Sequence, residues 1–107
     1  MRRGDIVPVV LPGVYGKPRP ALVIQSDLFD EHSSVTLVPI TSEIREAPLI
    51  RLHVPPSRGN GLQKPSDLMV DKVHTTPRSK VGKAFGRLEK EYVTELERLL
   101  TVFLGLA

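Results

Sequence analysis

The spacing of apolar residues changes once along this chain of 107 residues, and that change limits the folds available to it. Up to about residue 88, the apolar residues come in short runs that Pro, Gly, Asn and Ser separate. Short runs of this kind are typical of β-strands. From residue 89 onward, the apolar residues recur at helical spacing instead. The sequence therefore predicts a series of strands followed by one terminal helix.

Six segments have the pattern of strands. The segment 19–26 is almost entirely apolar at its centre, as expected for a strand covered on both faces. The segment 49–54 alternates between apolar and polar residues. Pro8 marks the first strand as an edge or bulged strand, because proline cannot donate a hydrogen bond to a neighbour. The predicted strands are residues 4–11, 19–26, 35–41, 49–54, 67–73 and 83–88, with loops or turns at 12–18, 27–33 and 55–61.

The terminal helix is predicted over residues 89–106, where an apolar stripe runs from Tyr92 to Phe103. Gly105 supplies a stop signal. We expect the stripe to pack on the strands rather than to bind a partner. The length indicates one domain over residues 1–107. The expected fold class is therefore α+β, mainly β, with five to seven short strands in a small barrel or strongly twisted sheet.

Cysteine is absent, which excludes a disulfide framework and a thiolate zinc site. The N-terminal stretch has two arginines but only a short apolar run, which Pro8 interrupts, so it does not have the pattern of a secretory signal. No apolar run approaches the length that a membrane-spanning helix needs. We therefore expect a cytoplasmic protein without a membrane partner.

The balance of charge favours a nucleic-acid partner. The formal net charge is +3 and the sequence pI is about 9.5, which is typical of a basic nucleic-acid-binding domain. Only five residues are aromatic, so base stacking is not expected to be the main mode of binding. Contacts from Arg and Lys to phosphates are the more natural expectation. The aromatic residues are Tyr15, Phe29, Phe85, Tyr92 and Phe103.

Arg19 stands between two prolines, directly ahead of an apolar run. Pro18 and Pro20 each fix their own φ and push the preceding residue toward an extended backbone. Two interpretations follow from these residues alone. Arg19 is either a surface residue at the start of a strand or a functional arginine on a restricted backbone.

In their order and spacing, six motifs resemble the MazF/PemK/Kid toxins of type II toxin–antitoxin systems, and the resemblance runs from end to end. Each motif is weak by itself, and the combination is specific. The motifs are RGDIV at 3–7, PG at 12–13, GKPRPALVIQSD at 16–27, VPITS at 38–42, NGLQKPSDLMVDKVHT at 60–75 and FLGL at 103–106.

The resemblance implies an SH3-like barrel of about six strands with a C-terminal helix, in a two-fold homodimer. It implies metal-independent cleavage of single-stranded RNA at short sequences, leaving a 2′,3′-cyclic phosphate and a free 5′-hydroxyl. It also implies a cognate, MazE-like antitoxin whose acidic, partly disordered tail covers the RNA groove. No cofactor is implied.

Three catalytic residues follow from the resemblance. The family's catalytic arginine matches Arg19, whose guanidinium offers phosphate oxygens a rigid fork of donors. Its catalytic threonine matches Thr41, although the hydroxyl of a threonine at a strand end also often bonds the local backbone of a turn. Asp71 matches an acidic position that acts as a base or an RNA contact in some members. The other interpretation of Asp71 is a turn-forming residue.

Further RNA contacts are expected at Lys17, Ser42, Ser66, Lys72 and His74. The family commonly has an arginine at the position of His74, which could act instead as a base because imidazole titrates near neutrality. The loop 12–18 lacks the acidic residue common there and offers Tyr15 and Lys17. The preferred cut sequence is therefore expected to differ.

The other patterns considered do not support a different chemistry. His32, His53 and His74 are 21 residues apart each time, which is not the spacing of a compact metal site, so no metal is predicted. The stretch 13–20 lacks the pattern of a P-loop. Two alternatives to a ribonuclease remain: a CcdB-like gyrase poison on the same fold, and a non-catalytic barrel that binds nucleic acid. A gyrase poison of that group carries a tryptophan-containing C-terminal tail, which this chain lacks.

Overall fold

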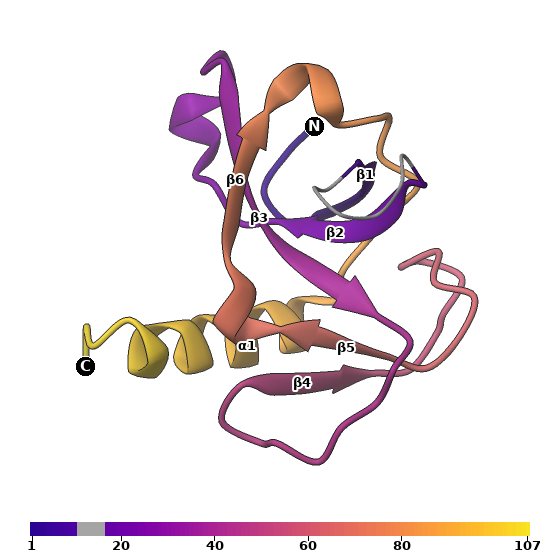
Figure 1. Cartoon of the computed structure of the whole chain (residues 1–107), viewed down its shortest axis with the longest axis vertical. Coiled ribbons are helices and arrows are strands. Elements are labelled where there is room, and N and C mark those ends of the chain that lie inside the picture. Colours follow the sequence, from indigo (N-terminus) through magenta and orange to yellow (C-terminus); the bar gives the residue numbers. More distant parts are fainter. Residues whose placement is uncertain (11–16) are drawn as a thin grey trace.

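The structure is a computed structural model, and it describes residues 1–10 and 17–107. The described residues form a curled sheet of short strands with one α-helix at the C-terminal end (Figure 1). The strands are β1 (Asp5–Val9), β2 (Arg19–Val23), β3 (Ser34–Thr41), β4 (Arg51–Val54), β5 (Ser66–Met69), β6 (His74–Pro77) and β7 (Gly86–Arg87). The helices are the 3₁₀ turns η1 (Asp27–Phe29), η2 (Val70–Lys72) and η3 (Arg78–Lys80), and the α-helix α1 (Lys90–Phe103).

The eight-residue strand β3 connects the two parts of the sheet, and all the pairings between strands are antiparallel. Its middle pairs with β2, its first half with β6 and its last two residues with β5. The order along the sheet is β4-β5-β3-β2-β1-β7. Because one long strand changes partners along its length, the sheet curls into a half-barrel rather than lying flat. This confirms the predicted mainly β fold with a C-terminal helix.

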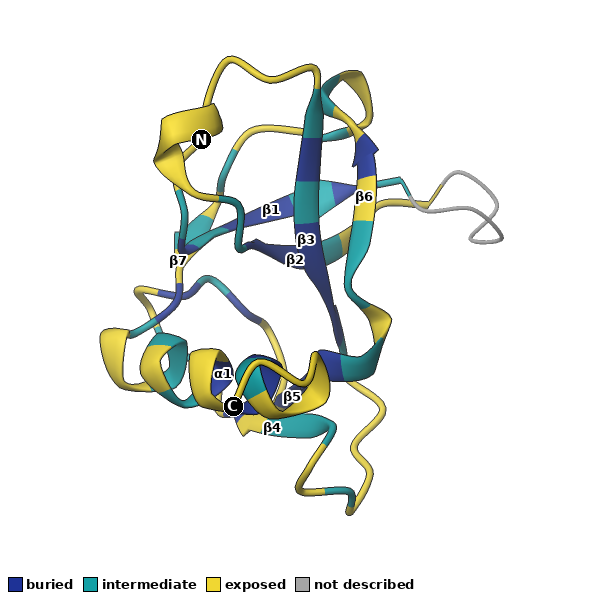
Figure 2. Ribbon diagram, turned by 90° about the vertical axis from the view of Figure 1, so that its left-hand side faces the viewer, coloured by how far each residue is buried: buried dark blue, intermediate teal, exposed yellow. Residues whose placement is uncertain are grey.

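The central strands bury both of their faces. In β2 the side chains of Ala21, Leu22 and Val23 are all buried, as the continuous apolar run predicts. Leu22 packs in a core with residues of β3, β4, β5 and α1, whereas Ala21 and Val23 pack on the opposite face. Figure 2 shows this buried band through β1, β2 and β3, with most of the loops exposed. The sheet is therefore held by two small cores.

Helix α1 covers the larger of these cores. Leu96, Leu99 and Leu100 are buried, so the predicted stripe does face the strands. The stripe does not extend to Phe103, which is 45% exposed where the helix ends. Gly105 follows with φ +71, which confirms the predicted stop. Figure 1 shows α1 at the same end of the molecule as β4 and β5. Within the described ranges, no helix is both long and apolar enough to cross a membrane.

The segment 67–73 is not one strand, so that prediction was wrong. The strand ends at Met69, η2 turns the chain, and a further strand, β6, begins at His74. Buried Val70 anchors this turn, because its side chain packs in the larger core. From its sequence alone, a short apolar run can be one continuous strand or a strand followed by a turn. Here the separate pairings of β5 and β6 with β3 distinguish the two cases.

The predicted strand 83–88 pairs only at Gly86 and Arg87, because the ladder with β1 is bulged. Ile6 pairs with Gly86, whereas Val9 bridges Val81, so this segment has two more residues than β1 over the same interval. A bulge bends the strand and turns side chains away from their regular alternation. Pro8 lies within this interval, as expected for a residue of a bulged ladder.

Candidate functional site

An open groove of about 820 Å³ lies between four parts of the chain. These parts are the start of β2, the end of β3 with the residues that follow it, the segment 61–66, and Phe85 just ahead of β7. Prolines of β1, β2 and β3 also line the groove, so much of its wall is rigid and apolar. Its charged and hydroxyl-bearing residues are Arg19, Thr41, Ser42, Glu43, Lys64 and Ser66.

Arg19 and Thr41 line the same groove from neighbouring strands. The ladder between β2 and β3 ends at the pair of Ala21 with Pro39, and Arg19 and Thr41 each lie two residues beyond this pair, toward the same end of the two strands. Thr41 itself pairs with Asp67 of β5. In the groove, Arg19 is exposed and Thr41 is half-buried. One guanidinium and one hydroxyl are thus present in a single groove.

The hydroxyl of Thr41 has a fixed partner. Its Oγ1 accepts a hydrogen bond of 3.1 Å from the backbone N–H of Glu43. This is the local turn contact that the sequence allowed as one interpretation of Thr41. The contact uses the hydroxyl only as an acceptor, and a hydroxyl also carries one donor. The O–H of Thr41 therefore remains able to donate to a bound anion.

A buried carboxylate holds the chain just beyond Thr41. Asp67 is 1% exposed and pairs with Thr41 across β3 and β5. Its Oδ2 accepts from the backbone N–H of Arg45 at 2.9 Å and from Nη1 of Arg51 at 3.3 Å. The same Nη1 donates to the backbone carbonyl of Glu43 at 3.0 Å. Hydrogen bonds to β4 and β5 therefore hold the segment that carries Ser42 and Glu43.

A buried amide organises the opposite wall. Asn60 is completely buried, and its Oδ1 accepts from the backbone N–H groups of Ser57 and Leu62, both at 3.0 Å. Its Nδ2 donates to the carbonyl of Pro55 at 3.0 Å and to Oε1 of Glu89 at 3.2 Å. The four hydrogen bonds of this side chain thus restrain the 55–62 loop and connect it to Glu89, just ahead of α1. The groove residues at the end of this loop are therefore held by a buried polar network.

The groove gathers only part of the predicted set. Arg19, Thr41, Ser42 and Ser66 line it. Lys17 is exposed and directly precedes Pro18, a lining residue, whereas Tyr15 lies outside the described residues.

Asp71, Lys72 and His74 are not among the lining residues. Asp71 and Lys72 lie on η2, and His74 pairs with Leu37 of β3. Leu37 is four residues from Thr41, which corresponds to about 13 Å along a strand. The Oδ1 atom of Asp71 is buried without a hydrogen-bond partner. In this single chain, these three residues therefore stand apart from the pair Arg19 and Thr41.

The lining residues that were not predicted from the sequence include Glu43, Gln63, Lys64 and Phe85. Glu43 follows the matched VPITS motif directly, and Gln63 and Lys64 lie within the matched stretch 60–75, so proximity to a motif could have found them. Phe85 carries no comparable signal. Its exposure depends on the bulge between β1 and the segment before β7, which involves residues far apart in the chain.

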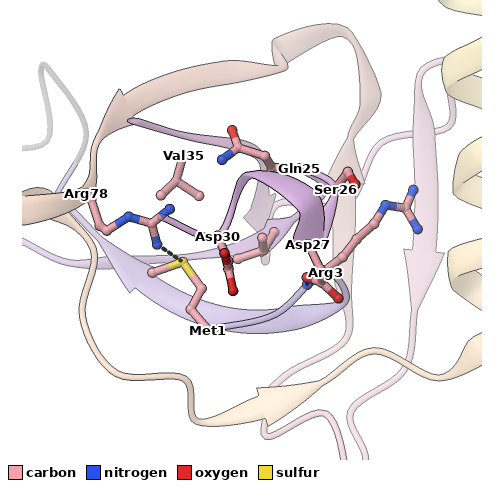
Figure 3. A pocket seen from close by; sticks show the side chains of 9 residues that line it. Met1, Arg3, Gln25, Ser26, Asp27, Asp30, Val35 and Arg78 are labelled. Carbon is pink, nitrogen blue, oxygen red and sulfur yellow. Dashed lines mark hydrogen bonds between the residues drawn. The ribbon is translucent and has the colours of Figure 1, made fainter. Parts of the chain in front are cut away.

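A second cavity near the N-terminus is too small for a ligand (Figure 3). Its volume is about 10 Å³, which corresponds to about one water molecule. Arg3 lines it and connects three parts of the fold. Its backbone N–H donates to Asp27 at 2.7 Å, its Nε donates to the carbonyl of Ile24 at 3.0 Å, and its Nη1 lies 3.0 Å from Oε2 of Glu97. We interpret this cluster as structural.

The described part of the chain contains no group of three or more His, Cys, Asp or Glu residues placed to hold a metal ion. The groove itself offers cations, hydroxyls and one carboxylate.

Comparison with known families gives one match across nearly the whole chain. The family described as "PemK-like, MazF-like toxin of type II toxin-antitoxin system" matches residues 2–104. The probable endoribonuclease MazF of Mycolicibacterium smegmatis is 48% identical over 108 residues, which cover 100% of this chain and 99% of that protein.

Solved structures with the same fold include toxins alone and with antitoxins. The Mycobacterium tuberculosis toxin MazF-mt6 has a TM-score of 0.80 at 27% identity, over 96% of this chain and 98% of that one. An endoribonuclease in complex with its cognate antitoxin, from a mycobacterial species, has a TM-score of 0.83 at 20% identity, over 100% and 97% of the two chains. A MazE–MazF crystal structure from Deinococcus radiodurans has a TM-score of 0.81 at 20% identity, over 100% and 98%. At 20% identity, the last two likenesses show the shared fold.

Proposed function

Because the chain belongs to the PemK-like, MazF-like toxins of type II toxin–antitoxin systems, we propose that it is an endoribonuclease that cuts single-stranded RNA in the groove described above. The observation that carries the proposal is that Arg19 and Thr41 line the same groove, where they would offer a cation and a hydroxyl donor to one phosphate. The 48% identity to a relative named a probable endoribonuclease supports the same activity.

The proposed reaction is an internal transfer of the phosphoryl group. The 2′-oxygen of the ribose attacks the adjacent phosphorus and forms a new bond to it, while the bond from phosphorus to the 5′-oxygen breaks. A base takes the proton of the 2′-hydroxyl, and the leaving 5′-oxygen gains a proton. The products are a 2′,3′-cyclic phosphate and a free 5′-hydroxyl, and no water is consumed.

Arg19 is proposed to stabilise the charge that builds on the phosphorane oxygens, because its planar fork can donate two parallel hydrogen bonds to them. Pro18 and Pro20 restrict the backbone on either side of it. Thr41 is proposed to donate its O–H to the same group while the N–H of Glu43 fixes the position of its oxygen. Preorganised donors of this kind need little rearrangement during the reaction.

Glu43 is our candidate for the base. Among the described residues that line the groove, it supplies the carboxylate, and it stands two residues after Thr41. A carboxylate within reach of the 2′-hydroxyl can accept its proton. Asp71 and His74, the candidates from the sequence, would need a partner subunit or a movement of the chain to reach the phosphate that Arg19 holds. Their proposed part is in RNA binding, together with Lys72.

The cation of Arg19 also supports metal-independent cleavage, which stays a proposal. The test uses purified protein and a mixture of short RNAs, with EDTA in one arm. We expect cleavage to continue in EDTA, and the downstream fragment to accept phosphate from a polynucleotide kinase without prior phosphatase treatment. Loss of activity in EDTA that magnesium restores would overturn this mechanism. No cleavage of any RNA would favour a gyrase poison or a non-catalytic nucleic-acid-binding protein instead.

We also propose a homodimer with two equivalent sites and a cognate antitoxin that covers the groove with an acidic segment. The small core favours association, and an isologous interface would give each dimer two grooves. Solved toxin–antitoxin complexes of the same fold support an antitoxin partner. The cations Arg19 and Lys64 support an acidic segment at the groove. Light scattering at micromolar concentration tests the dimer. Competition between a candidate antitoxin and labelled RNA tests the second proposal.

A further inference from the structure

Phe85 is an exposed aromatic residue inside the groove. It is 47% exposed and lines the cavity together with Gly61 and Lys64. Among the described residues, Phe85 is the aromatic side chain that lines the groove. Ligand sites in proteins are lined mainly by apolar and aromatic side chains, with a few polar groups that fix the orientation of the ligand.

The bulge ahead of β7 places Phe85 there. Gly82 N–H donates to the carbonyl of Pro8 at 2.8 Å and Phe85 N–H to that of Ile6 at 3.0 Å, so the bulge lies between these two bonds. Gly86 then resumes the regular pairing with Ile6. Bulges beside functional sites commonly redirect a side chain. Phe85 is the residue that directly follows this bulge.

Phe85 also packs against the backbone of Gly61. Gly61 has φ +71, and a Cβ at that position would lie 2.9 Å from Cδ2 and 2.7 Å from the carbonyl oxygen of Phe85. The backbone of Gly61 therefore packs directly against Phe85 without a side chain between them. Asn60, with its four hydrogen bonds, holds Gly61 in this position, and Arg87 N–H donates to the carbonyl of Gly59 at 2.9 Å. Little conformational freedom remains to be lost when a ligand covers the ring.

We infer that Phe85 is a stacking platform for one nucleobase of the RNA. The base that stacks on Phe85 lies at a fixed position next to the cut, and tight binding requires a base at that position. The inference rests on the proposed function. A base presents a flat π-face of the size of the ring, and stacking of this kind contributes substantially to single-strand binding. Arg19 and Lys64 in the same groove would hold the flanking phosphates.

The test is a double-mutant cycle between protein and RNA. The probe is a short RNA that the wild-type chain cleaves, fully 2′-O-methylated so that it binds without being cut, and labelled for fluorescence anisotropy. A series of probes lacks the base at one position each. The proteins are the wild type, Phe85→Ala, Phe85→Trp and the control Phe29→Ala, which removes an aromatic ring of similar exposure outside the groove lining.

On the intact probe, we expect Phe85→Ala to weaken binding by about 5- to 150-fold, the range of one base–aromatic stack. Phe85→Trp should retain binding, and Phe29→Ala should leave it unchanged. On the probe that lacks the stacked base, Phe85→Ala should cause no further loss, whereas on every other probe its full effect should remain. Thermal unfolding of each variant shows that the losses are not due to unfolding.

Two outcomes overturn the inference. If Phe85→Ala is folded and binds as the wild type does, the ring contributes nothing. If its loss is the same on every abasic probe, the ring contacts the RNA without stacking on a particular base. A wild-type chain that neither binds nor cleaves RNA overturns the proposed function as well, so the two failures can be told apart.

Discussion

Nη1 of Arg51 lies 3.3 Å from Oδ2 of Asp67, and the two side chains are only 8% and 1% exposed. The pair spans neighbouring strands, since Arg51 pairs with Met69 and Asp67 with His53. Arg51 also donates to the carbonyl of Glu43, so the ion pair extends to the segment that follows Thr41. A structural ion pair under the groove thus connects the stability of the sheet to the geometry of the site.

Replacing one partner of this pair should be costly. Asp67→Asn leaves the guanidinium of Arg51 buried without a counter-charge, and breaking a buried pair on one side typically costs about 3–5 kcal/mol. That is a large share of the about 5–15 kcal/mol that stabilises most domains. Urea unfolding should show the loss as a lower midpoint. The double variant Arg51→Met, Asp67→Asn should lose less than the sum of the two single losses.

The matched control is the exposed ion pair of α1. Arg98 donates to the carboxylate of Glu95, which lowers the pKa of Glu95 below its usual value. The pair therefore favours the folded state above the unfolded pKa and loses this effect as the pH falls. Since solvent screens it, Glu95→Gln should leave the unfolding midpoint almost unchanged at neutral pH. A loss in Asp67→Asn no larger than in Glu95→Gln would contradict the structural role of the buried pair.

Arg19 and Thr41 should act as one unit. Arg19→Ala should lower single-turnover cleavage by on the order of 10²–10⁴, the range for a positioned catalytic donor, and Thr41→Ala should fall in a similar range. If both contact the same phosphate in the transition state, the double variant should be only slightly worse than the less active single variant. Arg19→Lys should also be poor, because a point charge cannot reproduce the fork. Circular dichroism checks that Arg19→Ala is folded. If the folded variant cleaves at the wild-type rate, Arg19 is only a surface residue at the start of a strand.

The identity of the base can be read from substitutions of the candidate residues. If Glu43 is the base, Glu43→Gln should reduce single-turnover cleavage by about 10²–10⁴. Asp71→Asn and His74→Gln should have smaller effects, mainly on binding. A cleavage rate that Glu43→Gln leaves unchanged and His74→Gln abolishes would favour His74 as the base.

Gly86 and Gly59 make a matched pair for stability. A Cβ on Gly86 would lie 2.0 Å from the backbone oxygen of Asn60, so Gly86→Ala forces two segments of backbone apart. We expect a loss of about 1–3 kcal/mol in the free energy of unfolding. A Cβ on Gly59 meets no heavy atom within 4 Å, so Gly59→Ala should change stability by no more than about 0.5 kcal/mol. Equal unfolding midpoints for the two variants would contradict the close packing of Gly86 on Asn60.

The local pattern of the sequence determined the classes of element. The change of period near residue 89 correctly separated the strands from α1, and the continuous apolar run of Ala21, Leu22 and Val23 correctly indicated a strand buried on both faces. Periodicity reports these features because it depends only on neighbours in the chain. The motif around Arg19 and that around Thr41 likewise indicated the family, which the match over residues 2–104 confirms.

The tertiary structure alone decided which residues meet. The pairing of β2 with β3 brings Arg19 and Thr41 to the same groove, and the turn at η2 leaves Asp71 and His74 outside its lining. The bulge beside β1 leaves Phe85 exposed in that groove. Register, bulges and the burial of Asp67 depend on pairing between distant segments. A one-residue change in pairing would alter each of them without altering the periodicity of any segment.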